Sequence, residues 1–344
     1  MHTAYTYDPT HVGHVHANHP EKPQRAHLAF NTLERDGILG TLACLDPVPN
    51  PEAAITRVHP QDYYDLLRET QKRAPFLFGF DTYVTPESFG IAERGVGALL
   101  ALTDAVADGT VDNGFALVRP PGHHARPFEA MGFCFFANVA IAVQHARAVQ
   151  GVERLLVVDF DVHHGNGTQE VFYDDPNVLV VSSHQYPFYP GTGALQETGE
   201  GRGVGATLNL PLPPNVGDAG ILELYRRTVL PATDRFKPDM VFVSAGFDAH
   251  YLDPLGETAL SIRGFADLVL LCMEIADQHC DDRLVCALEG GYHVDVVAHS
   301  ILTTLRLLQD PHAPISDPFG APSSPTTDDL STLIGNVRDL HGLG

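Results

Sequence analysis

Six short runs of apolar residues constrain the fold of this chain more than any other feature of its sequence. Several of these runs are continuously apolar rather than alternating, as in VLVVS and LVCAL. Continuous runs are typical of strands buried on both faces, as in a parallel sheet that is covered by helices. The runs predict strands over 115–118, 155–160, 178–182, 207–210, 240–244 and 284–288.

Segments with helical periodicity lie between these runs. Phe89, Ala92 and Val96 recur at a spacing that places them on one face of a helix over 89–106. Further helices are predicted at about 23–36, 61–72, 136–149, 218–230, 262–279 and 294–308. This alternation of strands and helices predicts an α/β fold in one domain over residues 1–308, with a central, mostly parallel sheet flanked by helices.

Residues 309–344 differ in composition from the rest of the chain. They are rich in Pro, Ser and Asp, which is typical of an extended surface segment. A short helix is predicted near 327–338. We expect this C-terminal extension to pack on the domain or to trail from it.

The charge of the chain restricts its partners. There are 43 Asp and Glu residues against 21 Lys and Arg, which gives a formal net charge of −22. Such an excess of acid repels phosphate backbones and anionic lipids, so we expect neither a nucleic-acid partner nor a membrane partner. The acidity serves solubility, and it would also attract cationic substrates.

Cysteine usage and hydropathy predict a cytoplasmic protein. The five cysteines are widely spaced and form no Cys-x-x-Cys pair, which argues against a disulfide framework and against a structural zinc ribbon. No secretory signal is visible, and no stretch of 18 apolar residues is present that would span a membrane.

Ionisable residues and glycines follow almost every predicted strand. Five of these segments are RPPGHH (119–124), DFDVHHGNG (159–167), SH (183–184), AGFDAH (245–250) and EGGY (289–292). Ligands of open parallel sheets bind beyond the carboxyl ends of the strands, so we expect these segments to form one site. A purely structural explanation would have to account for five such strand ends independently.

Asp161 and His163 are candidate metal ligands. Alternate residues of an extended segment project to the same side, so Asp159, Asp161 and His163 can line one wall. Asp248 would add a second carboxylate to Asp161 and His163. Such a set suits a divalent cation and leaves a coordination position open for water or a substrate carbonyl. Taken alone, an Asp-x-His pair is equally compatible with a surface loop.

The adjacent His123 and His124 are candidates for proton transfer. By themselves, two histidines after a Pro-Pro-Gly turn could simply cap a helix or a loop. Asp159 is the expected hydrogen-bond partner of His123. Asn166 is the expected partner of His124. Because a carboxylate partner raises the basicity of an imidazole, we expect the pKa of His123 to be the higher of the two.

Tyr292 is a candidate oxyanion donor. It follows two glycines, which allow a sharp turn or a close approach to a ligand. Its phenol could donate a proton to a developing oxyanion opposite the metal. An ordinary surface tyrosine in a turn is the alternative.

Together these motifs resemble the zinc-dependent histone deacetylase superfamily, and within it the class II-like bacterial histone deacetylases and acetylpolyamine amidohydrolases. The resemblance spans about residues 10–308 and implies the arginase/deacetylase fold, with about eight mostly parallel strands. It also implies hydrolysis of an acetyl amide on an aminoalkyl chain. The motifs are HPEKPQR (19–25), RPPGHHA (119–125), GFCFFANVA (132–140), VVDFDVHHGNGTQ (157–169), YPGTG (189–193), SAGFDAH (244–250) and LEGGY (288–292).

The resemblance assigns roles to the candidate residues. Asp161, His163 and Asp248 would bind one Zn2+, with iron left open as the native metal. His124 would be the general base, and His123 would act electrostatically or as the general acid. Tyr292 would polarise the acetyl carbonyl. Potassium (K+) is also implied beside this site, on Asp159, Asp161, His163, Ser182 and Ser183, with a second ion near Phe172, Asp175 and Val178.

The resemblance also implies a substrate tunnel. Gly132 would lie at its base, and Phe133 and Tyr189 would form its walls, although many relatives have Phe at the second wall. Leu255 stands where the polyamine-selective relatives place a Glu, which favours an acetylated lysine peptide or protein over an acetylpolyamine. Asp81, on a rim loop, is expected to contact the substrate. The entrance loops are expected to include His11, His14, His16 and His19.

Two other functions stay open at this stage. A two-metal ureohydrolase of the arginase type shares the fold, but it normally has further Asp ligands where this chain has His and Gly. The other is a catalytically silent, acetoin-utilisation-type regulatory protein that binds acyl-lysine. The presence of His123, His124 and Tyr292 counts against this second function.

Overall fold

The computed structural model describes residues 1–324 and 326–344. An eight-stranded sheet with parallel pairing throughout occupies its centre, in the order β2-β1-β5-β10-β9-β6-β7-β8, which confirms the predicted α/β fold. The strands are β1 (Thr3–Thr6), β2 (Ala43–Cys44), β5 (Asn113–Ala116), β6 (Leu155–Asp159), β7 (Val178–Gln185), β8 (Thr207–Leu212), β9 (Met240–Ala245) and β10 (Leu284–Leu288). A separate antiparallel hairpin joins β3 (Phe76–Phe78) and β4 (Thr82–Val84).

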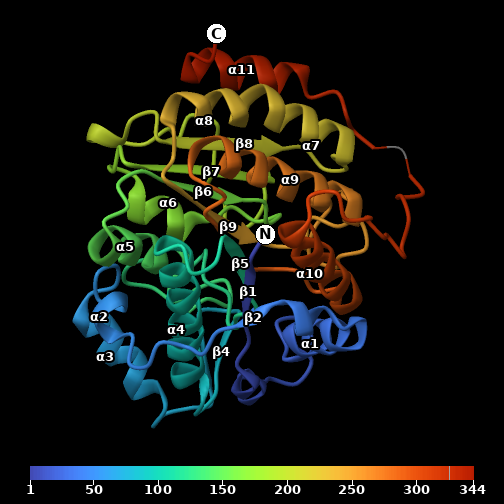
Figure 1. Ribbon diagram of the computed structural model, residues 1–344. Coiled ribbons are helices and arrows are strands. Elements are labelled where there is room, and N and C mark those ends of the chain that lie inside the picture. The colour runs from blue at the N-terminus through green and yellow to red at the C-terminus, as the bar shows by residue number, and fades with distance from the viewer. Residues whose placement is uncertain (325) are drawn as a thin grey trace.

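Helices cover both faces of this sheet (Figure 1). They are α1 (Gln24–Asp36), α2 (Glu52–Ile55), α3 (Gln61–Thr70), α4 (Ser88–Ala107), α5 (Asn138–Gln150), α6 (Asn166–Phe172), α7 (Asp218–Leu224), α8 (Leu230–Phe236), α9 (Ile262–His279), α10 (Val294–Gln309) and α11 (Ser331–His341). Short 3-10 turns are η1 (Pro9–Gly13), η2 (Ile38–Thr41) and η3 (Gly201–Gly203), and η4 (Tyr225–Val229) is a π turn.

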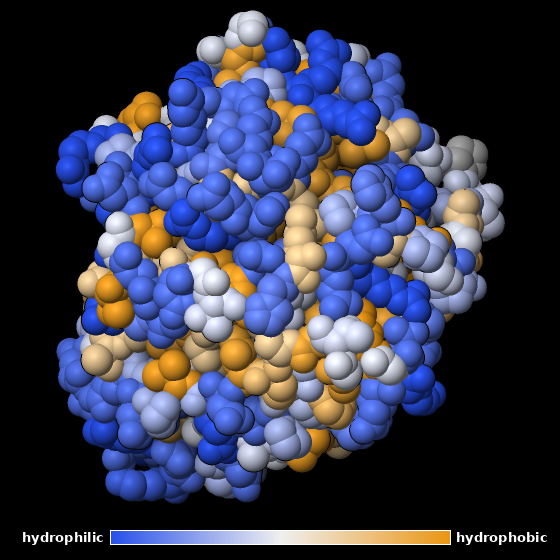
Figure 2. All heavy atoms as spheres, viewed as in Figure 1, coloured by the Kyte–Doolittle hydropathy of each residue, from blue (hydrophilic) through white to orange (hydrophobic). Residues whose placement is uncertain are grey.

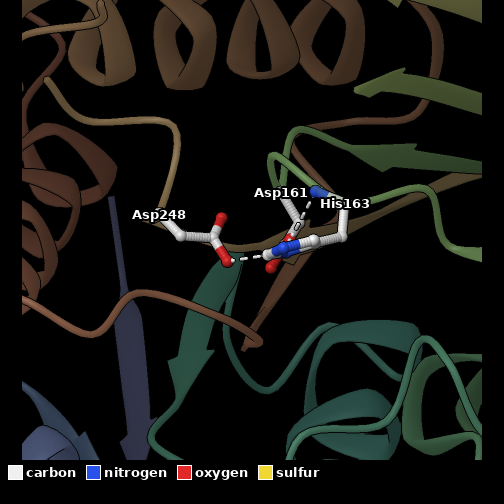
Figure 3. A group of neighbouring side chains, drawn as sticks. All are labelled: Asp161, His163 and Asp248. Carbon is white, nitrogen blue, oxygen red and sulfur yellow. Dashed lines mark hydrogen bonds and ion pairs between the residues drawn. The ribbon is translucent and has the colours of Figure 1, made fainter. Parts of the chain in front are cut away.

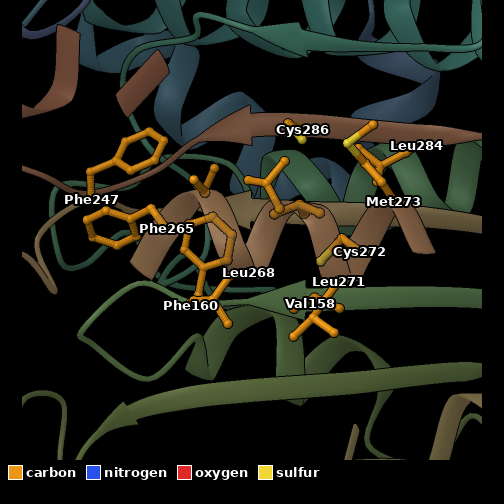
Figure 4. Packing of buried hydrophobic residues seen from close by; sticks show 14 of the residues in the cluster. Val158, Phe160, Phe247, Phe265, Leu268, Leu271, Cys272, Met273, Leu284 and Cys286 are labelled. Atoms are coloured by element: carbon orange, nitrogen blue, oxygen red, sulfur yellow. The ribbon is translucent and has the colours of Figure 1, made fainter. Parts of the chain in front are cut away.

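The strands in the middle of the sheet supply side chains to two hydrophobic cores, one on each face. In β6, Leu156 and Val158 pack into the core beneath α1, α9 and α10, whereas Leu155 and Val157 pack into the core beneath α4 and α5. All four side chains are fully buried. Figure 4 shows α9 lying on the first of these cores, against β6 and β10. Burial of each such side chain contributes about 1.5–3 kcal/mol, which explains why these strands are apolar at successive positions.

The sequence analysis missed two strands of the central sheet, β1 and β2, and both strands of the β3–β4 hairpin. β1 consists of Thr3, Ala4, Tyr5 and Thr6 and therefore has no continuous apolar run, yet it is buried between β2 and β5. β2 is only two residues long. Pairing with neighbouring strands, rather than local sequence, determines both.

The helix predicted at 218–230 is longer and interrupted. α7 continues through η4 into α8, which ends at Phe236. Pro231 has no N–H to donate to the carbonyl of Arg227. The Arg338 side chain of α11 donates to that carbonyl instead, at 2.8 Å. The carbonyl that the proline leaves without an N–H donor is therefore still hydrogen-bonded.

The C-terminal extension contacts the domain through its last helix. Leu330, Ile334 and Val337 are buried in the core beneath α7, η4 and α9. The helix begins at Ser331 rather than near residue 327, because Thr327 forms a β-bridge with Val216.

The outer surface seen in Figure 2 is mostly hydrophilic, with smaller apolar areas between the polar side chains. This distribution agrees with the large excess of acidic residues. No helix within residues 1–324 and 326–344 is both long enough and apolar enough to cross a membrane.

Candidate active site

The sheet order brings the predicted site segments together at the carboxyl ends of the strands, which we call the carboxyl edge of the sheet. β5, β10, β9, β6 and β7 are consecutive neighbours, and all run in the same direction. Their carboxyl ends therefore meet, and Asp159 at the end of β6 lies opposite Ser244 of β9 and Ser182 of β7. Five segments that are far apart in the sequence thus converge beyond the same edge.

Asp161, His163 and Asp248 form a cluster at this edge (Figure 3). One ligand atom of each lies within 4.8 Å of the others. Asp161 and Asp248 are fully buried, and His163 is 9% exposed. His163 Nδ1 is 3.1 Å from Asp161 Oδ1 and 3.2 Å from Asp248 Oδ2. In the described part of the chain, no Lys or Arg forms an ion pair with either carboxylate. Two carboxylates, one imidazole and this spacing fit a divalent metal ion such as zinc.

Glycines allow the backbone to approach these carboxylates closely. A Cβ atom on Gly246 would lie 2.0 Å from Asp161 Oδ2, and one on Gly290 would lie 2.1 Å from Asp248 Oδ2. The N–H of Gly290 donates to Asp161 Oδ2 at 2.7 Å. The Gly-Gly segment after β10 therefore packs directly against the metal-ligand candidates. A side chain at Gly290 would prevent this packing.

The two adjacent histidines have the partners that the sequence suggests. His123 Nδ1 lies 2.9 Å from Asp159 Oδ2, and His124 Nδ1 lies 2.8 Å from Asn166 Oδ1. Burial opposes the charged form of His123, but Asp161 and Asp159 raise its pKa well above the ordinary value. Burial and the neighbouring His123 lower the pKa of His124 well below the ordinary value. The pKa of His123 is therefore shifted upward and that of His124 downward, which is the order expected from their partners.

Glu289 supports the histidine pair from the end of β10. Its Oε2 atom accepts the N–H groups of Gly122 at 2.7 Å and His123 at 3.1 Å. Burial raises the pKa of Glu289 to about 7, against the opposing effect of His123. The sequence analysis included this residue in a motif but gave it no role.

Tyr292 is buried beside the cluster. Burial and the neighbouring carboxylates Asp248 and Asp161 raise the pKa of its phenol well above the ordinary value, although Arg25 acts in the opposite direction. The phenol therefore keeps its proton at neutral pH and is able to donate it in a hydrogen bond. The Arg25 guanidinium lies over the Tyr292 ring, 5.0 Å from its centroid.

Two charged residues that the sequence analysis did not single out hold the Tyr292 loop. Arg25 donates to the carbonyl of Gly291 at 2.5 Å and to that of Glu289. Asp253 accepts the N–H of Tyr292 at 2.6 Å. Burial and Asp248 raise the pKa of Asp253 to about 7. Arg25 belongs to the HPEKPQR motif, whereas Asp253 gave only the signal of an Asp-Pro turn.

The predicted tunnel residues lie next to the histidines and the tyrosine. Gly132 has φ +54°, and a Cβ there would lie 2.4 Å from His124 Cδ2, so this position packs against the imidazole. The ring of Phe133 lies 5.8 Å from that of Tyr292, between centroids. The ring of Tyr189 lies 5.1 Å from that of His124.

The two predicted rim residues lie on separate segments. Asp81 is in the β3–β4 turn, where its Oδ1 accepts the hydroxyl of Thr82 at 2.9 Å; that hydroxyl in turn accepts the N–H of Phe133 at 3.0 Å. Asp81 also contributes to the raised pKa of Tyr189, after burial. Leu255 lies in the segment after β9, and its N–H donates to Asp253 Oδ1 at 3.0 Å.

Two of the N-terminal histidines that were expected in the entrance loops, His11 and His14, have buried side chains. These residues are 3% and 1% exposed, and their carbonyl groups accept hydrogen bonds from Arg119. Arg119 also pairs with the buried Glu21, so charge pairing draws this segment inward. His19 does lie beside the tunnel wall, with its ring 4.7 Å from that of Phe133.

Comparison with known proteins gives one consistent family. Residues 19–308 match the histone deacetylase domain. The chain is 39% identical to a probable deacetylase of Archaeoglobus fulgidus over 279 residues, which are 80% of this chain and 77% of that relative. It is 41% identical to the human polyamine deacetylase HDAC10 over 313 residues, which are 87% of this chain and 46% of the human protein. The crystal structure of the HDA15 HD domain superposes with a TM-score of 0.89 at 33% identity, covering 99% of this chain and 94% of the other.

Proposed function

This chain belongs to the histone deacetylase family and has its arginase/deacetylase fold, and from that premise we propose that it is an amidohydrolase that removes acetyl groups from the ε-amine of lysine in peptides or proteins. The observation that carries the proposal is the convergence of the histidine pair, Tyr292 and the Asp161–His163–Asp248 cluster at one sheet edge. Such a site contains a base, a hydrogen-bond donor for an oxyanion and an open metal site.

The family is in general zinc-dependent, and the donor set of this chain fits that ion. Asp161, His163 and Asp248 would hold one zinc ion. When bound there, it would supply Lewis-acid activation of the water and of the acetyl carbonyl. The burial of the cluster and the lack of a paired Lys or Arg among the described residues support this assignment.

In the proposed reaction His124 is the general base. Its Nδ1 hydrogen bond to Asn166 Oδ1 places the proton on Nδ1 and leaves Nε2 free to accept a proton from the attacking water. The lowered pKa of His124 keeps it neutral at the start of the reaction. His123, protonated and paired with Asp159, acts electrostatically or as the acid that protonates the leaving amine.

Tyr292 donates a hydrogen bond to the oxyanion that forms from the acetyl carbonyl. Its raised pKa supports this role, because the phenol stays protonated. A positioned donor of this kind contributes about 3–4 kcal/mol to stabilisation of the transition state.

The remaining predicted residues concern substrate and potassium. Phe133 and Tyr189 would enclose the methylene groups of the acyl-lysine, above Gly132. Leu255 and Asp81 would contact the substrate at the rim. Potassium binding at Ser182 and Ser183 stays a prediction; the hydroxyls of these residues contact His184 Nδ1 at 3.0 Å and the Tyr225 hydroxyl at 2.8 Å.

An acetylpolyamine is the second candidate substrate. The 41% identity to the human polyamine deacetylase and the net charge of −22 favour it, whereas Leu255 favours acetyl-lysine. The test is a comparison of kcat/KM for an acetyl-lysine peptide and acetylputrescine, using purified protein whose zinc and iron content has been measured. We expect the peptide to be the better substrate. A preference for acetylputrescine would replace the proposed substrate, and inactivity on both would refute the proposed function.

A further inference from the structure

We propose that Asp253 is a positioning residue that holds the Tyr292 loop in its reactive conformation and couples it to the rim segment of Leu255. The proposal rests on the proposed function, because it takes Tyr292 as the oxyanion donor. Asp253 lies between β9 and α9, whereas Tyr292 follows β10, so the contact joins two separate strand-end segments.

The Asp253 carboxylate is bonded to three main-chain amides. Its Oδ2 atom accepts the N–H of Tyr292 at 2.6 Å and that of His293 at 3.1 Å. Its Oδ1 atom accepts the N–H of Leu255 at 3.0 Å. Fixing the Tyr292 amide fixes the direction in which its side chain leaves the backbone.

The burial of Asp253 indicates that the carboxylate serves these amides. The residue is 7% exposed, and no Lys, Arg or His pairs with it in the part of the chain that the structure describes. A buried carboxylate is unfavourable unless hydrogen bonds replace its hydration. The three amides are the donors that act in this way: burial and Asp248 raise the pKa of Asp253 to about 7, and the amides oppose that rise.

Other side chains bind the remaining main-chain groups of the Tyr292 loop. Arg25 binds the carbonyls of Gly291 and Glu289, and Asp161 binds the N–H of Gly290. Asp253 binds the amides of Tyr292 and His293, so backbone groups from Glu289 to His293 are held by side chains from three other segments. A donor must be placed to within about 0.5 Å to stabilise a transition state, so contacts that hold the backbone on both sides of Tyr292 serve its proposed role.

The test is a double-mutant cycle between Asp253→Asn and Tyr292→Phe. Asn places an NH2 group against amide donors, and we expect kcat to fall about tenfold or more with KM changed by less than about threefold. In the Tyr292→Phe background the same substitution should lower kcat by no more than about twofold, because the phenol through which Asp253 acts is already absent. An equal loss in both backgrounds overturns the proposal.

Asp218→Asn is the matched control. Its carboxylate also accepts a main-chain N–H, that of Ser261 at 2.9 Å, but it has no contact with the Tyr292 loop. We expect kcat to stay within about twofold of the unmodified protein, and a loss as large as that of Asp253→Asn would overturn the specific role. If Asp253→Asn does not fold, Asp253→Ser replaces it. The serine hydroxyl can accept a hydrogen bond and places no NH2 group against the three main-chain amides.

Hydrogen exchange tests the contact independently of catalysis. The amide hydrogens of Tyr292 and His293 should exchange faster in Asp253→Asn than in the unmodified protein. Their exchange rates should be unchanged in Asp218→Asn. Unchanged exchange in Asp253→Asn would overturn the proposal even if activity fell. If the unmodified protein is not a deacetylase, the proposed function fails, while faster exchange would still show that Asp253 holds the loop.

Discussion

The two ends of the strands in the central sheet, its amino edge and its carboxyl edge, differ in how their charged side chains are paired and buried. At the amino edge, Arg154 before β6 pairs with Asp239 before β9 at 3.1 Å, and both side chains are more than 30% exposed. At the carboxyl edge, five carboxyl groups are buried with few cations to balance them: Asp159, Asp161, Asp248, Asp253 and Glu289. A paired, hydrated charge changes the free energy of folding little. Clustered buried carboxylates destabilise the folded state unless cations or amide donors compensate for their lost hydration. The same sheet therefore has one edge where an ion pair is hydrated and one where buried carboxylates are gathered.

Substitution of a ligand candidate gives the largest expected contrast between the edges. Asp248→Ala should abolish deacetylase activity and reduce bound zinc from one ion per chain to almost none, because only two protein ligands would remain. Activity assays and elemental analysis measure both. Asp239→Asn, at the opposite end of β9, should retain activity and zinc. Unchanged zinc content in Asp248→Ala would refute its assignment as a ligand.

A substitution at the same edge that spares the metal should have an intermediate effect. Tyr292→Phe should lower kcat about tenfold or more while zinc stays stoichiometric, because only the oxyanion donor is lost. Tyr64→Phe is the control: it also removes a buried phenol hydroxyl, one that donates to Glu93 on the α3–α4 side of the fold, and should leave kcat within about twofold. Full activity in Tyr292→Phe would exclude the oxyanion role.

The smallest expected effect is at the amino edge. Although burial acts in the opposite direction, Arg154 lowers the pKa of Asp239 below its ordinary value. The folded protein then binds fewer protons at this site than the unfolded chain, so the stabilisation is present above the unfolded pKa of about 4 and is lost as pH falls through the folded value. Asp239→Asn should lower the free energy of unfolding by about 0.2–1 kcal/mol at pH 7, and the difference should shrink in acid.

Urea titrations at pH 7 and near pH 3, with activity measured in parallel, test this last prediction. A difference that grows as pH falls would contradict the assigned sign. A large loss of activity would contradict the separation of the two edges.

The parts of the fold that the sequence predicts are those determined locally. Buried strand β10 is apolar at every position and β6 at every position before its last residue, Asp159. α9 was predicted with the bounds that the structure gives it, beginning after Ser261, whose hydroxyl caps the first turn. β1 and β2 depend on partners far along the chain, so no local pattern marks them.

The same reasoning applies to the site. Asp161 and His163 are two residues apart and follow a strand. Their proximity was predictable because alternate side chains of an extended segment project to the same side. The contact of Asp253 with Tyr292 joins two loops through main-chain amides, which carry no signal in side-chain identity. The burial of His11 and His14 was not predicted, because their contacts with the buried Arg119–Glu21 pair become visible only when the chain is folded.

The hydrogen bond from Arg25 to the carbonyl of Gly291 spans 266 positions of the chain. It has a consequence for any attempt to divide the protein. A cut in the connection between β7 and β8 would leave Arg25 and the histidine pair on one fragment and Asp248, Asp253 and Tyr292 on the other. Neither fragment would contain a complete catalytic centre, and recovery of activity on mixing them would report that the two halves had reassembled.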